Sequence, residues 1–114
     1  MNTRILLVGE DPVLLATRAF LLAEWSTEIA SAKDAFTVLK AKSFDLLVIG
    51  QLVPGQITKK LIAEAKTLKP SPVILAIRFP DEDIDLGVET HTTDSGASPA
   101  WFRDCVARLI ASDR

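Results

Sequence analysis

Three short runs of consecutive apolar residues form the framework of the chain. They are Ile5 to Val8, Leu46 to Ile49 and Val73 to Ile77, and glycine or proline lies beside each run. Uninterrupted apolar runs of this length are typical of strands buried on both faces, as in a parallel sheet. A shorter run with β-branched residues, Thr27 to Ala30, predicts a further strand at an edge.

Segments with helical spacing separate these predicted strands. The first should run from about Pro12 to Trp25, the second from about Lys33 to Lys42 and the third from about Ile57 to Leu68. In each, apolar residues recur at intervals of three or four, which is the period of a buried helix face. For the first helix, the stripe expected to be buried includes Val13, Leu14, Phe20 and Leu21.

The final helix has the clearest sequence signals. Ser98 suits the N-cap position and Pro99 suits the first helical position. A single apolar stripe follows, made of Trp101, Phe102, Cys105, Val106, Leu109 and Ile110. This pattern predicts a helix with one apolar face.

The segment from Asp81 to Gly96 is the least regular part of the chain. Ile84, Leu86, Val88, Thr90 and Thr92 alternate with other residues, which is the period of a strand. Between Asp81 and Gly87 we therefore predict at most about one helical turn. A last strand is expected at about Val88 to Thr93.

The alternation of strands and helices predicts one α/β domain with helices on both faces of a parallel sheet. A length of 114 residues fits a single domain spanning residues 1–114, and 48% hydrophobic residues suffice for a core. The net charge is −2 and no basic run is present, so direct nucleic-acid binding is not expected. No stretch is long enough to span a membrane, and a single cysteine, Cys105, fits a reducing compartment, so we expect a cytoplasmic protein.

Five strands alternating with helices describe a flavodoxin-like sheet of order 2-1-3-4-5. Three stretches also resemble signature segments of the receiver domain of two-component response regulators. They are Arg4 to Pro12, Phe44 to Gly55 and Pro72 to Ile77, of which the second is the most specific because its spacing, apolar pattern and Pro-Gly pair all fit. The resemblance covers nearly the whole chain and becomes weaker after Phe79.

The resemblance implies a phosphoacceptor site that this chain has lost. Receivers carry an aspartate nucleophile after the third strand, and that position is Gly50 here. An acidic pair that helps to hold magnesium falls on Gly9 and Glu10, and the hydroxyl position after the fourth strand falls on Ile77. The lysine and proline after the fifth strand fall on Ser98-Pro99 or, without a gap, on Asp94-Ser95.

These substitutions predict a domain without receiver phosphorylation chemistry, because a carboxylate nucleophile and its metal ligands are required together. We therefore expect no catalytic residue, no cofactor and no metal site. Glu10 and Asp11 are adjacent acids that could bind a cation alone, but acids at a helix N-terminus are favoured by the helix dipole and explain them better.

Two functional hypotheses follow. In the first, the chain is a pseudo-receiver that binds a protein partner or a second copy, and a histidine kinase or an output regulator is the kind of partner implied by the resemblance. The last strand and last helix would form the interface, with His91, Arg103 and Arg108 as candidate residues. In the second, a small ligand or nucleotide binds in the crevice at the carboxyl ends of the strands, although the sequence has no glycine fingerprint.

Overall fold

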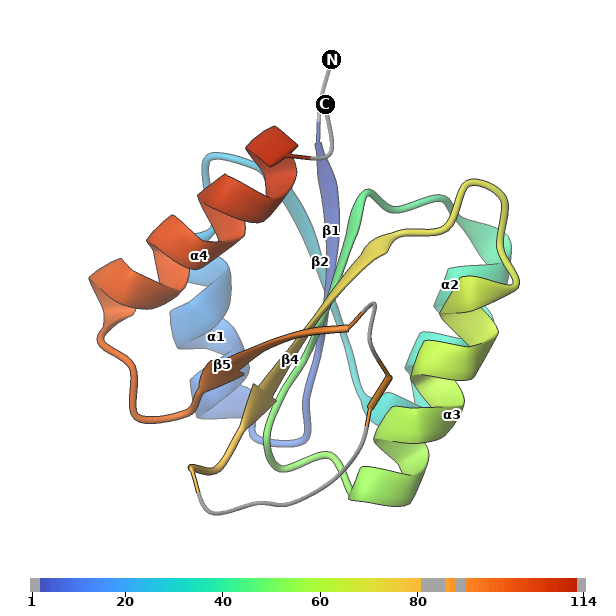
Figure 1. The fold of residues 1–114 in the computed structure, drawn as a ribbon, viewed down its shortest axis with the longest axis horizontal. Helices are drawn as coiled ribbons and strands as arrows, with labels where there is room; N and C mark the ends of the chain where they lie inside the picture. Colours follow the sequence, from blue (N-terminus) through green and yellow to red (C-terminus); the bar gives the residue numbers. More distant parts are fainter. Residues whose placement is uncertain (1–2, 81–85, 88–89, 113–114) are drawn as a thin grey trace.

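A five-stranded parallel sheet forms the centre of the molecule, with strand order β2-β1-β3-β4-β5 (Figure 1). The computed structural model describes residues 3–80, 86–87 and 90–112. The strands are β1 (Arg4–Val8), β2 (Ser26–Ala30), β3 (Leu46–Ile49), β4 (Val73–Arg78) and β5 (His91–Asp94). The helices in the described part are α1 (Pro12–Leu21), α2 (Ala32–Ala41), α3 (Gly55–Lys66) and α4 (Pro99–Ser112). The predicted α/β class and strand order are confirmed.

The three apolar runs form the central strands because their side chains are buried on both faces. Every residue of β3 is buried, and β1 is buried from Ile5 onward. The parallel register pairs Val8 with Ile49 and Ile49 with Ala76, so the carboxyl ends of these strands lie side by side. Consequently the loops after β1 and β3, which contain Gly9 and Gly50, meet at one edge of the sheet.

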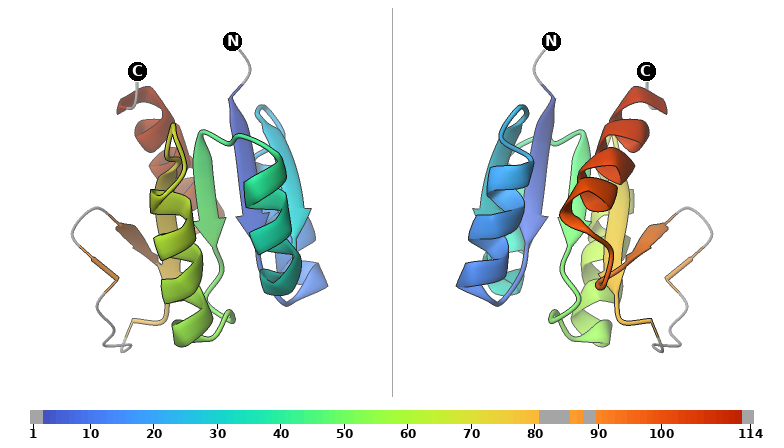
Figure 2. Two further views of the ribbon diagram at one scale, coloured as in Figure 1. Left: turned by 90° about the vertical axis from the view of Figure 1, so that its right-hand side faces the viewer. Right: turned by 90° about the vertical axis from the view of Figure 1, so that its left-hand side faces the viewer.

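Two helical layers cover the sheet (Figure 2). On one side, α2 and α3 pack on a cluster that includes Leu6, Val8, Leu39, Leu47 and Leu61. On the other side, α1 and α4 cover a second cluster with members Ile5, Leu7, Leu22, Leu75, Ile77, Phe102 and Val106. Strand alternation explains the division, since successive residues of β1 belong to opposite clusters.

Helix α1 differs from its prediction in both length and orientation. It ends at Leu21 and not at Trp25, because Leu22 to Trp25 form a turn closed by a 3.0 Å hydrogen bond from Trp25 N to Leu22 O. Val13 and Phe20 were expected in the core, but their side chains are 73% and 80% exposed. The side that meets the sheet carries Leu15, Ala19 and Leu22 instead, at the helical spacing of four and three.

The first residues of two other helices are fixed by serine caps. Ser98 Oγ accepts a hydrogen bond from Trp101 N at 3.1 Å, which confirms the predicted cap of α4. Ser31 Oγ caps α2 in the same way through Asp34 N, at 3.2 Å. Within the α4 stripe Phe102 and Val106 are buried as predicted, but Trp101 is 55% exposed, so its place in the core was predicted wrongly. Trp101 is the first aromatic of the helix and points away from the sheet side occupied by Phe102.

The last strand is shorter than predicted and begins later. β5 covers His91–Asp94, whereas the sequence indicated about Val88 to Thr93. Between β4 and β5 the described residues contain no helix. The helical turn predicted between Asp81 and Gly87 falls largely on residues 81–85, which lie outside the described residues. Leu86, which is described, is 9% exposed and joins the core cluster under α3. No helix in the described ranges is long and apolar enough to cross a membrane.

Candidate functional site

The crevice where a receiver would carry its phosphoacceptor lies between the loops after β1 and β3. Gly50 N donates a 2.8 Å hydrogen bond to Val8 O, and Gly9 N donates a 3.2 Å bond to Ala30 O. These bonds continue the sheet ladder by one residue beyond the strands. Both glycines are therefore held rigidly at the sheet edge, at the positions that the sequence resemblance assigned to acidic residues.

The guanidinium of Arg18 fills this crevice. A Cβ atom added to Gly50 would lie 3.2 Å from Arg18 Nη1, and Arg18 Nη2 donates a 2.7 Å hydrogen bond to Gln51 Oε1. The remaining cavity, bordered by Gly9, Glu10, Asp11 and Gly50 among others, measures about 10 Å³. That volume accommodates about one water molecule. A phosphoryl group beside Gly50 would have to share this crevice with the Arg18 guanidinium.

Arg18 brings a permanent positive charge to the site. Burial lowers the pKa of Arg18, and the nearby carboxylate of Asp11 opposes this by raising the pKa. An arginine side chain nevertheless remains protonated throughout the physiological range. A cationic side chain of the protein itself thus lies where a receiver collects a metal cation, although the group next to it is a glycine rather than a carboxylate.

Sequence reasoning missed Arg18. The signal was present in the chain, because Arg18 is the only charged residue between Pro12 and Ala23. A lone cation in an otherwise uncharged amphipathic helix calls for a specific environment for that charge. Whether the Arg18 side chain points toward Gly50 depends on which side of α1 faces the sheet. The predicted buried stripe, which included Val13 and Phe20, placed the wrong side of the helix against the sheet.

Glu10 and Asp11 both act as helix caps. Asp11 Oδ1 accepts a 2.9 Å hydrogen bond from Val13 N at the start of α1. Glu10 Oε1 accepts a 2.9 Å bond from Ala32 N, at the start of α2. The two carboxylates thus serve the N-termini of different helices, where anions are favourable. Within the described residues no group of three or more metal-ligating side chains occurs.

Leu15 occupies the space next to Gly9. A Cβ atom on Gly9 would come within 2.9 Å of Leu15 Cδ2, closer than nonbonded carbon atoms normally approach. Leu15 in turn packs against the buried cluster under α1. An aspartate at position 9 would therefore have to displace a core side chain, so the second carboxylate cannot be restored without repacking.

The other residues that the resemblance placed in the receiver pocket lie on separate elements of the fold. Ile77 is 2% exposed and pairs with Thr93 across the β4–β5 ladder. Of the two positions for the receiver lysine, Asp94 is the last residue of β5, whereas Ser98 lies four residues farther along as the α4 cap. Asp94 Oδ1 accepts a 2.7 Å hydrogen bond from Gly96 N in the loop. The structure thus places no cation after β5 among these residues.

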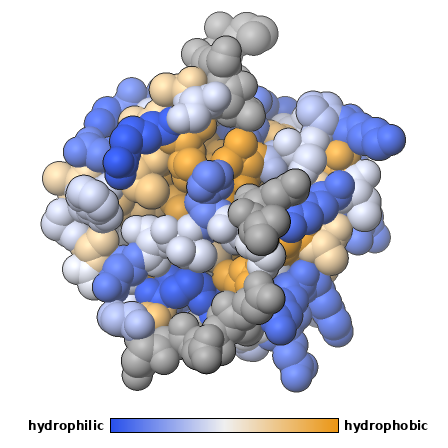
Figure 3. All heavy atoms as spheres, in the orientation of Figure 1, coloured by the Kyte–Doolittle hydropathy of each residue, from blue (hydrophilic) through white to orange (hydrophobic). Residues whose placement is uncertain are grey.

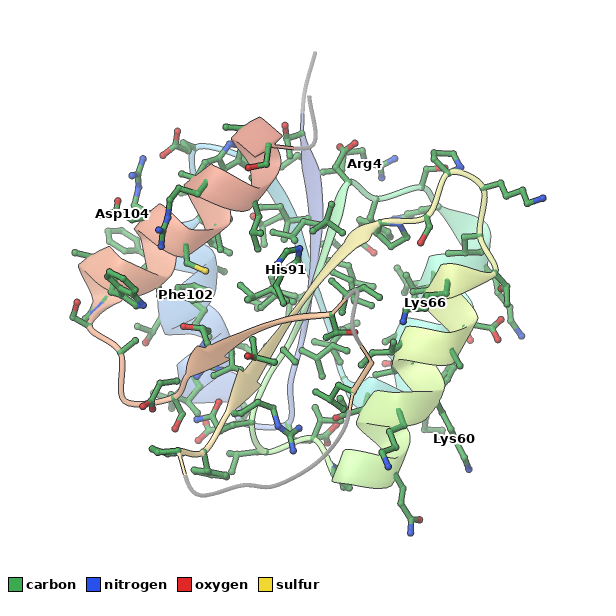
Figure 4. The ribbon with its side chains drawn as sticks, in the orientation of Figure 1. Arg4, Lys60, Lys66, His91, Phe102 and Asp104 are labelled. Atoms are coloured by element: carbon green, nitrogen blue, oxygen red, sulfur yellow. The ribbon has the colours of Figure 1, made fainter. Side chains whose placement is uncertain are left out.

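The three candidate interface residues lie in different surroundings. His91 is exposed at the start of β5, and strand alternation puts it on the same face as Thr93, toward α4 (Figure 4). Arg103 forms an ion pair with Glu24 and lies over the Trp25 ring, 5.6 Å from its centroid, so it connects α4 with the turn after α1. Arg108 is exposed and lies 5.2 Å from the centroid of the Trp101 ring.

Solved structures with the same fold are signal receiver domains. The chain superposes on a response regulator receiver protein from Sinorhizobium medicae with a TM-score of 0.78 and 16% identity, covering 99% of this chain and 98% of that one. The receiver domain of an HD domain-containing protein from Pseudomonas fluorescens gives a TM-score of 0.82 at 18% identity, with 99% and 98% covered. For the receiver domain of a histidine kinase from Syntrophus aciditrophicus the values are 0.82 and 16%, with 96% and 91% covered.

Sequence comparison adds no closer relationship. No protein-family model matches the chain, and no curated protein matches it. The structural similarity extends over nearly the full length of both partners, at identities of 16–18% for these three structures. The chain therefore has the fold of response-regulator receiver domains.

Proposed function

We propose that this chain is a pseudo-receiver that takes part in signal transduction without being phosphorylated. The observation that carries the proposal is the guanidinium of Arg18 beside Gly50. Phosphoryl transfer to a receiver needs a carboxylate nucleophile and a metal site that neutralises charge. Gly50 supplies no nucleophile, and the Arg18 guanidinium occupies the space beside it. The domain is accordingly a binding module and not an enzyme.

The proposed mode of action is association with a protein partner or with a second copy. A receiver fold that is not phosphorylated in its crevice can still transmit a signal by binding another protein through its surface. The face of α4 and β5 is the favoured surface, since it presents His91 and Arg108 to solvent together with the half-exposed Trp101. In Figure 3 the most apolar atoms lie near the middle of this face, with moderately apolar ones on the α4 side, while the α3 side is mostly hydrophilic. A histidine kinase or an output regulator is the proposed class of partner.

Treatment with a phosphodonor tests the central claim. The purified chain is incubated with acetyl phosphate and magnesium, and its intact mass is recorded alongside that of an active receiver treated in the same tube. The active receiver should gain a phosphoryl group and this chain should gain none. A stoichiometric phosphoryl adduct that maps to Glu10, Asp11 or any other crevice residue would show that the proposal is wrong.

The alternative function, a small ligand or nucleotide bound in the crevice, has less support from the geometry. A nucleotide would have to displace Arg18 from Gln51 and from its place over Gly50. A thermal-shift panel of nucleotides and flavins measures this directly, because saturation a hundredfold above the dissociation constant stabilises a protein by about 2.7 kcal/mol. We expect no shift with any of them.

A further inference from the structure

A second cavity, separate from the crevice, lies between α1, α4 and the carboxyl ends of β4 and β5. Its volume is about 150 Å³. A cavity of this size accommodates a molecule such as benzene. Phe102 forms part of its wall and lies on the inner side of α4, whereas Asp104 lies on the outer side (Figure 4).

Apolar side chains make up most of the cavity wall. Leu14 and Leu21 come from α1, Ile77 comes from β4, and Pro99 and Phe102 come from the first turn of α4. These residues belong to three separate elements and surround the cavity from different sides. They favour a ligand with a compact apolar body.

One polar side chain in the wall lacks the partner that burial requires. Thr93 is 9% exposed, and its hydroxyl has no hydrogen-bond partner in the part of the chain that the structure describes. Thr93 lines the same cavity and pairs with Ile77 between β4 and β5. Buried hydroxyls are normally hydrogen-bonded, because desolvation without a partner is unfavourable. A ligand atom in the cavity would supply the missing partner.

One cationic side chain, Arg18, contributes hydrogen-bond donors to the wall. Arg18 lines this cavity as well as the crevice, and Gln51 takes one hydrogen bond from its guanidinium, which has five N–H donors in total. Asp94 is the one carboxylate in the wall, and its Oδ1 already accepts from Gly96 N. The cavity therefore suits a ligand that accepts hydrogen bonds and carries a negative charge.

We propose that the cavity between α1, β5 and α4 binds a small monocarboxylate whose apolar body is about the size of a benzene ring. The carboxylate would accept from the guanidinium of Arg18 and from the hydroxyl of Thr93. A guanidinium presents paired donors that match the two oxygens of a carboxylate. The ring would lie among Leu14, Ile77 and Phe102. This inference is independent of the proposed pseudo-receiver function, since neither requires the other.

Titration of the full chain with sodium benzoate, followed by ¹⁵N–¹H correlation spectra, tests the proposal. We expect saturable shifts centred on Thr93, Ser95 and Phe102, with half-saturation near 1 mM, on the order expected for so small a ligand. Benzyl alcohol keeps the ring without the charge, and acetate keeps the charge without the ring. Each should bind at least about tenfold more weakly than benzoate, because each lacks one of the two required features.

Matched variants assign the site. Thr93→Val removes the hydroxyl at constant shape and should weaken benzoate binding by about threefold to tenfold. Thr92→Val alters the exposed neighbour and should leave binding unchanged. Arg18→Met should weaken binding by about tenfold or more. Well-dispersed spectra of each variant verify its fold.

Three results would overturn the proposal. The first is the absence of saturable benzoate shifts in the unaltered chain. The second is equal affinity for benzoate and benzyl alcohol, which would indicate a purely apolar cavity. The third is unchanged benzoate binding in both Thr93→Val and Arg18→Met. None of these would bear on the phosphodonor experiment, so the two proposals fail separately.

Discussion

At the scale of single residues, Arg18 has the greatest effect on the chemistry of the crevice. Its guanidinium lies beside Gly50, and one of its N–H groups is bound to Gln51. Loss of the phosphoacceptor alone would leave a hole at the carboxyl end of β3. Here the side chain of Arg18, which comes from α1, occupies that space.

Gly50→Asp should not restore phosphorylation. The new carboxylate would form an ion pair with Arg18, and Gly9, Ile77 and Asp94 would still fail to supply the other groups. Acetyl phosphate treatment followed by mass spectrometry should detect no adduct on the variant. An adduct at residue 50 would show that Arg18 leaves the site readily.

The pH dependence of the free energy of unfolding of Gly50→Asp gives an independent test of the ion pair between the introduced aspartate and Arg18. Gly50→Asn is the uncharged control. Arg18 should lower the pKa of the introduced Asp in the folded state below its unfolded value of about 3.9. Above about pH 3.9, the Asp variant should then be more stable than the Asn variant. This difference should disappear as the pH falls through the lowered pKa of the folded state. Urea unfolding at a series of pH values measures it.

At the scale of elements, the sequence predicted strands better than helix faces. The runs from Ile5, Leu46 and Val73 became central strands because burial on both faces leaves a continuous apolar pattern that tertiary contacts do not change. Helix α1 is apolar nearly all round, so periodicity did not indicate which side meets the sheet. The position of the Arg18 side chain depends on which side of α1 meets the sheet. The sequence therefore indicated a glycine at position 50, but it did not indicate that Arg18 would lie beside it.

A pair of truncations on α1 tests the corrected orientation. Leu22→Ala removes a fully buried side chain and should cost about 2–5 kcal/mol in the free energy of unfolding. Phe20→Ala removes a larger side chain that is 80% exposed and should change stability by less than about 0.5 kcal/mol. Urea denaturation of both variants gives the comparison. Equal losses would mean that the predicted stripe with Phe20 was right after all.

The cap of α4 should contribute measurably to the stability of the domain. Ser98→Ala removes the acceptor for Trp101 N and should lower the free energy of unfolding by about 1 kcal/mol. Ser112→Ala is a suitable control, because Ser112 Oγ only donates to Arg108 O at the exposed end of the same helix. Thermal unfolding of both variants should show the larger decrease for Ser98→Ala. A larger decrease for Ser112→Ala would contradict the assigned role of the cap.

At the scale of the whole molecule, the face formed by α4 and β5 carries two arginines in different surroundings. Arg103 is engaged with Glu24 and the Trp25 ring, so it ties α4 to the turn after α1. The Arg108 guanidinium lies over the Trp101 ring, and both residues are exposed and accessible to a partner. A specific interface buries roughly 800 Å² on each partner, with aromatic side chains favoured near its centre.

Charge reversal separates these two arginines. Arg108→Glu should leave thermal stability nearly unchanged while it slows association with the native partner and alters its salt dependence. Arg103→Glu should reduce stability as well, since it replaces an attraction to Glu24 by a repulsion. Analytical ultracentrifugation of the chain, alone and with a co-purified partner, measures both effects. Normal association of both variants would exclude this face as the interface.

The side chain beside Gly50 also determines what kind of information such a domain can carry. A molecular switch responds because an external event moves its population between two states, and the response is limited by the difference in binding free energy between them. In this chain the charge in the crevice is encoded covalently by Arg18 and is the same in every molecule. Under the proposed pseudo-receiver function, a phosphodonor does not bias one state over another through that position. With no ligand in the cavity between α1, β5 and α4, the output of the domain would then follow its concentration. Its synthesis and degradation would do the work that a kinase and a phosphatase do for a switch.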